Sequence, residues 1–173
     1  MKAVLVRIGV DQAYGGWNAP VDPTTGAFVY VPIPESATSF HPGCRRTFGE
    51  FIPALTRFYE ERRCEPQSRL SRQAMDESVH LDPDFEHLTY GDDGQHRGSA
   101  IAEFERGDLL VFYAGLKPLG TYVDKLMYAI VGLFVVDEVV PIANVIQERW
   151  HENAHTRKSS HGKHDIVVRA RAR

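Results

Sequence analysis

The sequence predicts an α+β domain, built as a strongly bent sheet or a small β-barrel with flanking helices. About five or six segments have the β-branched, alternating or continuously apolar character of strands, and about two or three have helical spacing. These segments do not alternate along the chain, so a parallel β-α-β arrangement is not expected. The length of 173 residues suits one domain with a substantial core, and we expect a single domain over residues 1–173.

The two strands with the clearest patterns lie in the second half of the chain. Residues 109–113 follow an Arg-Gly-Asp turn, and residues 128–136 are apolar on both faces, which is typical of a central strand. Gly132 inside the second strand predicts a bulge or a close approach of the backbone. Further strands are expected at 2–10, 28–31 and 165–169.

Two helices are expected to flank the sheet. Residues 47–63 have apolar side chains at helical spacing, and Thr47 with Glu50 forms the pattern of a capping box. A second helix is expected to begin at Pro141 and to continue past Trp150, because its apolar residues share one face. Loops are expected at 64–78 and, with an acidic and aromatic composition, at 80–92.

The composition excludes several classes of protein. The chain has two cysteines without a Cys-x-x-Cys pair, which argues against a disulfide framework or a thiolate zinc knuckle and favours a cytoplasmic location. Lys2 and Arg7 interrupt the apolar start, so no signal peptide is expected. No apolar run approaches the length of a membrane span, and no membrane partner is expected.

Charge is distributed unevenly, although the net charge is only -3. Residues 76–93 carry seven acidic side chains and no Lys or Arg, whereas residues 149–173 carry seven Lys or Arg, two acids and four histidines. A basic end of this kind can face phosphate even in an acidic protein. The alternative is a solvated basic tail beside an unrelated acidic loop.

Residues 151–155 match the zinc-protease pattern His-Glu-x-x-His. On an α-helix, His151 and His155 would share one face, and His161 has the spacing of a third ligand. Lys158 stands where such motifs need a glycine, and no Met follows to build the usual Met-turn. A zinc-dependent hydrolase, with zinc as its cofactor, is therefore the alternative, while the favoured expectation is no cofactor and two histidines on a solvated helix end.

Two resemblances to known families cover these segments. Residues 107–113 and 128–139 resemble the "Gly-Asp, apolar strand, Phe-Tyr … Ile-Val-Gly, apolar strand" stretch of PUA-like domains, including the EVE, YTH and ASCH groups. The whole chain more closely resembles the family called nucleotide modification associated domain 3. The segments that carry this second resemblance are 6–11, 14–20, 30–35, 80–92 and 149–157.

The resemblance implies a PUA-like core and a link to systems that make or handle modified nucleobases. The implied partner is DNA or RNA carrying a modified base, or a modified nucleotide; the sequence does not indicate the oligomeric state. The EVE and YTH groups bind a flipped modified base in an aromatic pocket, which is an analogy at the level of the fold. No catalytic residue is carried over.

These observations favour the recognition or processing of a modified nucleobase in nucleic acid, by a binding module rather than an enzyme. Base contact is expected from a Gly-Gly loop containing Tyr14, Trp17 and Asn18, although the loop could instead bury its own aromatic rings. A polar rim would face phosphate. Its expected members are Arg45, Arg149, His151, Asn153, His155 and Arg157, and further aromatic walls are expected from Tyr30, Tyr90 and Tyr113.

Four acidic residues are secondary candidates for metal binding or catalysis. Asp82, Asp84 and Glu86 could hold a divalent ion or act as a general base, although a solvated acidic loop is the simpler interpretation. If Asp11 faces the same pocket, an N-glycosidase-like activity becomes possible, because such enzymes stabilise an oxocarbenium-like centre with a carboxylate. The nucleobase hypothesis requires residues 14–18 and 149–157 to border one cavity.

Overall fold

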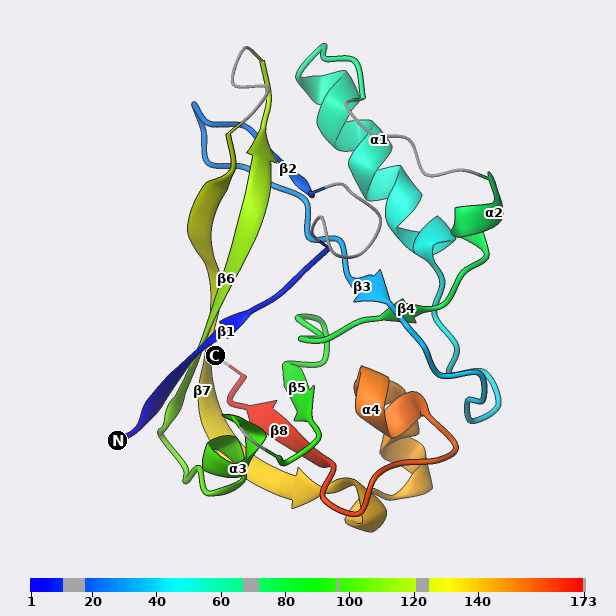
Figure 1. Ribbon diagram of the computed structural model, residues 1–173, viewed down its shortest axis with the longest axis vertical. Helices are drawn as coiled ribbons and strands as arrows, with labels where there is room; N and C mark the ends of the chain where they lie inside the picture. Colours follow the sequence, from blue (N-terminus) through cyan, green and yellow to red (C-terminus); the bar gives the residue numbers. More distant parts are fainter. Residues whose placement is uncertain (11–17, 67–71, 96, 121–124, 173) are drawn as a thin grey trace.

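A six-stranded mixed sheet forms the centre of the protein (Figure 1). The computed structural model describes residues 1–173 except 11–17, 67–71, 96, 121–124 and 173. The strand order is β1-β6-β7-β8-β5, and β2 pairs with β6. These strands are β1 (Ala3–Arg7), β2 (Pro20–Val21), β5 (Thr89–Asp92), β6 (Leu109–Pro118), β7 (Met127–Pro141) and β8 (Ile166–Ala170). A separate two-stranded sheet contains β3 (Ile33–Pro34) and β4 (Val79–His80).

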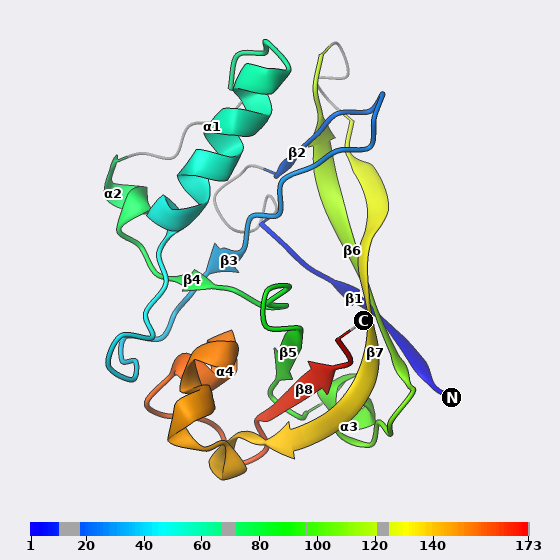
Figure 2. The same cartoon turned by 180° about the vertical axis from the view of Figure 1, so that it is seen from behind.

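The sheet bends along β7, whose first part pairs with one strand and whose second part pairs with another. The part of β7 up to Val135 pairs with β6, and the part from Val136 onward pairs with β8. Figure 2 shows β7 as a long curved strand that leads from the β6 hairpin to β8 and β5. The α+β class is confirmed. Of the two expected forms, a bent sheet or a small barrel, the barrel is wrong: in the described part of the chain the sheet stays open, with β1 and β5 at its ends.

Short helical segments surround the sheet. They are η2 (Phe48–Phe51), α1 (Ile52–Glu61), α2 (Arg72–Met75), α3 (Arg97–Ala102), η3 (Ile142–Asn144), η4 (Gln147–Glu152) and α4 (Ala154–Arg157). The helix expected at 47–63 is confirmed, and the Thr47 N–H donates to Glu50 Oε1 over 2.8 Å at its start. The described residues contain no helix with the length and apolar character that crossing a bilayer would require.

Several expectations about individual elements are wrong. The loops expected at 64–78 and 80–92 contain α2 and β5. Residues 28–31 form no strand; Phe28 makes only an isolated bridge to Val21.

The helix expected to begin at Pro141 is a series of short turns, because Val145 and Ile146 are extended and end η3 before η4 begins. A second break follows at Asn153, which is extended with φ −152° and ψ 158°. The residues on either side of Asn153 therefore do not share a helical face.

The core lies on one face of the sheet. Fully buried side chains on β6 and β7 include Leu110, Phe112 and Val136. The apolar pattern on both faces of β7 correctly indicated a central strand, but Ile130 and Leu133 are exposed rather than buried. The sequence pattern therefore located the strand and overestimated how much of it is covered.

Gly132 is the point at which the segment before β5 packs onto the sheet. The pairing of β6 with β7 shifts register between Phe112 and Tyr113, next to the Phe112–Gly132 pair. The Phe85 ring lies over this position, and a Cβ atom on Gly132 would come within 2.5 Å of Phe85 Cε1. The expected bulge and close approach are thus confirmed, with a ring as the approaching group. Phe85 in turn places its acidic neighbours beside the sheet.

Gly132→Ala is expected to destabilise the fold by ~1–3 kcal/mol, because the added methyl group would overpack the Phe85 ring. Chemical denaturation of the purified variant measures the change in the free energy of unfolding. The same substitution in a Phe85→Leu background should cost less, since the smaller side chain can yield. An equal cost in both backgrounds would contradict the proposed contact.

Candidate functional site

Asp84 closes a tight loop between β4 and β5. Its backbone N–H donates to the Thr89 carbonyl over 2.8 Å, and the Thr89 N–H donates back to the Asp84 carbonyl over 3.1 Å. The Asp84 carboxylate also accepts the N–H groups of Glu86 and His87, each over 3.0 Å. Asp84 is completely buried, so this part of the acidic segment is an internal support rather than a solvated loop.

Arg157 pairs with Asp84 in the interior. Its Nη2 lies 2.5 Å from Asp84 Oδ2, and its Nε donates to the His151 carbonyl over 2.9 Å. Burial would raise the pKa of Asp84, but the His87 N–H and the Arg157 guanidinium outweigh that effect and lower it. Arg157 is only 3% exposed, so the structure places it away from any surface that is open to phosphate.

Asn153 joins the same two segments from the other side. It is fully buried; its Oδ1 accepts the His155 N–H over 2.9 Å, and its Nδ2 donates to Asp82 Oδ1 over 2.9 Å. The first contact is an N-terminal cap on α4, which stops η4 from continuing into that helix. Asn153 is therefore a structural link, and its amide does not face solvent as the base-reading prediction requires.

The cap at Asn153 sends His151 and His155 to different neighbours. The His151 ring lies 5.0 Å from the His87 ring, whereas the His155 ring lies 5.0 Å from the His80 ring. Glu152 is buried and bonds Arg169 Nη2 over 2.7 Å. The helical face on which the His-Glu-x-x-His prediction depends is not formed, and no potential metal cluster among the described residues contains both His151 and His155.

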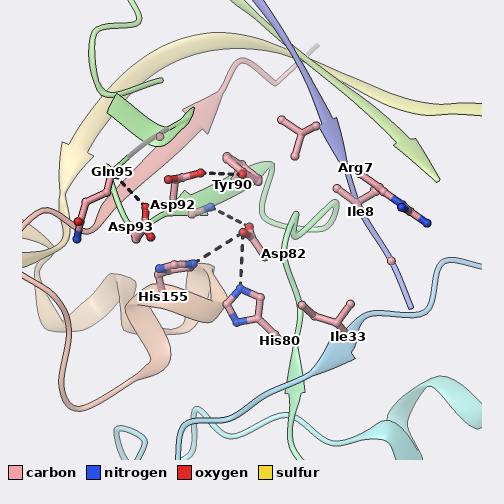
Figure 3. A pocket seen from close by; sticks show the side chains of 14 residues that line it. Arg7, Ile8, Ile33, His80, Asp82, Tyr90, Asp92, Asp93, Gln95 and His155 are labelled. Carbon is pink, nitrogen blue, oxygen red and sulfur yellow. Dashed lines mark hydrogen bonds and ion pairs between the residues drawn. The ribbon is translucent and has the colours of Figure 1, made fainter. Parts of the chain in front are cut away.

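A pocket of about 530 Å³ opens beside His155 (Figure 3). Its walls come from the end of β1, from Ile33 in β3, from the β4 and β5 segments, from Gly98 in α3 and from His155 in α4. The pocket therefore forms where segments that are distant in the sequence meet. The lining residues are Val6, Arg7, Ile8, Gly9, Ile33, His80, Asp82, Tyr90, Gly91, Asp92, Asp93, Gln95, Gly98 and His155.

Asp82 stands between the two histidines of this pocket. Its Oδ1 accepts the Gly91 N–H over 2.8 Å as well as the Asn153 amide, and its Oδ2 lies 3.8 Å from His80 Nε2 and 4.0 Å from His155 Nε2. Gly91 is required here, because a Cβ atom would collide with the His155 ring. The three side chains thus have a fixed arrangement with ligand-type atoms turned toward one another.

Carboxylates also stand behind the two histidines. His80 Nδ1 lies 2.6 Å from Glu35 Oε2. Burial would raise the pKa of Glu35, but the hydrogen bond and charge of His80, helped by Lys158, lower it to about 2. His155 Nδ1 lies 3.9 Å from Asp165 Oδ2, and this histidine holds the pKa of Asp165 below its ordinary value. Each imidazole therefore has an anionic group on the side away from Asp82.

Asp92 is a second acidic group at the far side of the pocket. It accepts a hydrogen bond from Tyr90 Oη over 3.0 Å and another from the Gly94 N–H over 3.1 Å. Burial and the neighbouring Asp93 carboxyl nevertheless raise the pKa of Asp92 above its ordinary value. Perturbed carboxyl groups in a pocket are typical of functional sites. Asp92 and His80 were missed as principal site residues, although both flank the acidic segment.

The remaining predicted contacts are dispersed. Asn18 is buried and donates to the Gly115 carbonyl over 2.7 Å, and Arg45 bonds Ser78 Oγ over 2.9 Å. Arg149 is 49% exposed and, with His151, borders a different cavity of about 550 Å³. Within 149–157, only His155 lines the pocket described above. Tyr14, Trp17 and Asp11 lie outside the described residues, so their expected base contact and chemistry stay predictions.

Glu86 and the predicted aromatic walls also have separate positions. Glu86 is exposed, close to Asp84 and His87. Tyr90 lines the pocket, whereas Tyr30 supports it from behind by donating from Oη to the Asp82 carbonyl over 2.8 Å. Tyr113 belongs to β6 and does not line this pocket. One of the three predicted aromatic walls therefore borders the space available to a ligand.

The sequence model of the family described as nucleotide modification associated domain 3 matches residues 2–173. No curated protein and no solved structure matches the chain significantly.

Arg157→Met is expected to destabilise the protein by about 3–5 kcal/mol, because it leaves the buried Asp84 carboxylate without its partner. Arg149→Met, at an exposed arginine eight residues earlier, should cost less than about 1 kcal/mol. Urea unfolding of both variants provides the comparison. Similar stabilities would show that Arg157 is not a structural residue.

Proposed function

Because the chain belongs to the nucleotide modification associated domain 3 family, we propose that it recognises or processes a modified nucleobase, which occupies the pocket beside Asp82, Tyr90 and His155. One observation carries this proposal: the pocket is lined by residues from four of the five segments that bear the family resemblance. These four segments are 6–11, 30–35, 80–92 and 149–157. The meeting of such distant segments at one cavity supports a shared ligand site.

The size and lining of the pocket suit a flat heterocycle. A volume of about 530 Å³ lies within the range of small-molecule sites. Figure 3 shows Ile8 and Ile33 on one side and Asp92 with Gln95 on the other. Aliphatic side chains can pack against the face of a base, while carboxyl and amide groups can bond its polar edge.

The charge of the pocket favours a base over a phosphate. Asp82, Asp92 and Asp93 place three carboxyl groups along it against one arginine, Arg7. This excess of carboxyl groups would repel a phosphate and accept hydrogen bonds from base amino groups. We therefore assign phosphate contact to cationic side chains outside the pocket, of which Arg45 and Arg149 are exposed. Tyr14 and Trp17 stay part of the proposal, five and eight residues after Gly9.

The resemblance to PUA-like domains supports the same function by analogy. The resembling residues are those of β6 and β7, the central pair of the sheet. EVE and YTH groups, which share the pattern, bind a flipped modified base. If a base is flipped out of the nucleic-acid duplex, the base alone can enter a pocket of this size while the rest of the duplex stays outside.

Processing of the base is the second candidate, and the raised pKa of Asp92 favours it. A carboxyl group with a raised pKa, such as that of Asp92, can donate a proton. Asp82 supplies a second carboxyl group in the same pocket. This pair would suit an N-glycosidase-like reaction, in which one carboxyl protonates the leaving base and another stabilises the sugar. Both candidates therefore use one pocket and differ only in turnover.

Asp92→Ala is expected to weaken the binding of a modified oligonucleotide at least about tenfold, since a polar partner of the base edge is lost. Fluorescence anisotropy at several salt concentrations measures the affinity, using oligonucleotides that carry different modified bases and an unmodified control. Gln95→Ala provides a second variant if Asp92→Ala unfolds at lower temperature. Glu61→Ala, at the exposed end of α1, should bind like the unchanged protein. Failure of the whole panel to bind at low salt would refute the proposal.

Incubation with modified DNA or RNA, followed by mass spectrometry, separates recognition from processing. Processing predicts a released base or a changed nucleotide mass, and loss of this product in Asp92→Ala. Unchanged mass in the presence of tight binding would eliminate processing and leave recognition.

A further inference from the structure

We propose that His80, Asp82 and His155 form a binding site for one divalent transition-metal ion in the wall of the pocket. Their candidate ligand atoms all lie within 4.8 Å of one another. They come from two parts of the fold: His80 ends β4 and Asp82 follows two residues later, whereas His155 belongs to α4. Two imidazole nitrogens and one carboxylate oxygen are the ligands of open sites for zinc or ferrous iron. Magnesium and calcium prefer oxygen ligands and fit this set poorly.

The distances need only a small adjustment to coordinate an ion. Asp82 Oδ2 lies 3.8 Å from His80 Nε2 and 4.0 Å from His155 Nε2. Ligand atoms at bond lengths of about 2.0–2.2 Å and at angles near tetrahedral would be about 3.4 Å apart. These two distances would have to shorten by roughly half an ångström, and the two histidine nitrogens, which lie within 4.8 Å of each other, would have to approach to the same separation. Rotation of the two imidazole side chains can supply movements of this size.

The surroundings orient each ligand atom toward the same point. Glu35 lies 2.6 Å from His80 Nδ1, and Asp165 lies 3.9 Å from His155 Nδ1. The hydrogen bond to Glu35 favours a proton on His80 Nδ1 and leaves its Nε2 lone pair facing Asp82. Within the described residues His155 Nδ1 makes no hydrogen bond, and Asp165 acts on this ring only through its charge. The Glu35–His80 pair is the usual outer support of a metal-bound histidine.

Asp82 is oriented in the same way. Both hydrogen-bond donors to its carboxylate, the Gly91 N–H and the Asn153 amide, act on Oδ1. Oδ2 is thereby left toward the histidines, as Figure 3 shows. All three side chains are mostly covered, with exposed fractions of 16% for His80, 6% for Asp82 and 13% for His155, yet all three line the pocket. An ion held by them would keep its remaining coordination positions open to a pocket ligand.

The site differs from the one that the local sequence pattern suggests. His155 is common to both, but its partner is His80, which lies 75 residues earlier, and not His151. The other cluster of potential ligands, Asp84, Glu86 and His87, is less suitable because Asp84 already accepts two N–H groups and pairs with Arg157. The oriented and accessible cluster is therefore the one around Asp82.

Metal titration of chelator-treated protein tests this site. Isothermal titration calorimetry with Zn²⁺, and the visible absorption of bound Co²⁺, should each show one tight site per chain. His80→Ala and His155→Ala should each weaken Zn²⁺ binding at least about 100-fold, whereas His151→Ala and His161→Ala should bind like the unchanged protein. Glu35→Gln should keep the 1:1 stoichiometry and lose roughly 10–100-fold in affinity, as expected for an outer support.

Circular dichroism and thermal unfolding establish that each variant is folded. A measurement on the unsubstituted protein does not depend on the folding of any variant. In ¹⁵N-edited NMR, one equivalent of Zn²⁺ should shift the Nε2 signals of two of the eight histidines. Absence of tight 1:1 binding, weak binding shared by many histidines, or loss of binding in His151→Ala with retention in His80→Ala would each overturn the proposal.

The metal proposal stands apart from nucleobase binding, because the titrations contain no nucleotide. Tight metal binding without oligonucleotide binding would refute the proposed function alone. Oligonucleotide binding that depends on Asp92, in a protein that takes up no metal, would refute the metal site alone.

Discussion

The buried ion pair between Asp84 and Arg157 is the constraint on which the pocket depends. It joins the segment before β5 to the last helix, α4, across 73 positions of the chain. Two charges without water are costly, and the cost is offset here because Asp84 also accepts two backbone N–H groups and Arg157 also donates to the His151 carbonyl. When both partners are present, the ion pair fixes the position of the segment before β5 relative to α4.

That position determines which neighbouring side chains face the pocket. Two residues before Asp84, Asp82 faces the pocket; two residues before Arg157, His155 does the same. Asn153 makes the alignment specific, since one amide caps α4 and bonds Asp82. Phe85, packed against Gly132, fixes the acidic segment to the sheet from the opposite side. Structural residues therefore alternate with pocket-lining residues within the same short segments. The structural residues hold the backbone in the position that directs the pocket-lining side chains into the pocket.

The fold was predictable from local patterns where one face or one turn decided the outcome. The strands at β6 and β7, the helix after Thr47 and the close approach at Gly132 all follow from apolar spacing, capping and the absence of a side chain. The helix expected from Pro141 is interrupted at Val145 and Ile146, which are extended. It is interrupted again for a tertiary reason at Asn153, whose extended backbone allows its amide to cap α4 and reach Asp82. Apolar spacing contains no information about that competing contact.

The sequence alone determined the α+β class and the family, because these depend on residue types and on their spacing along the chain. It also drew attention to 149–157 as a main candidate for the site and to the acidic residues of 80–92 as a reserve. Only the tertiary structure decided the role of each residue within those segments. Burial and pairing turned Arg157 and Asn153 into internal supports, and the break at Asn153 separated His151 from His155. His80 became the neighbour of His155 because β4 and α4 meet in space. Such contacts arise from packing between distant segments, which no local pattern can specify.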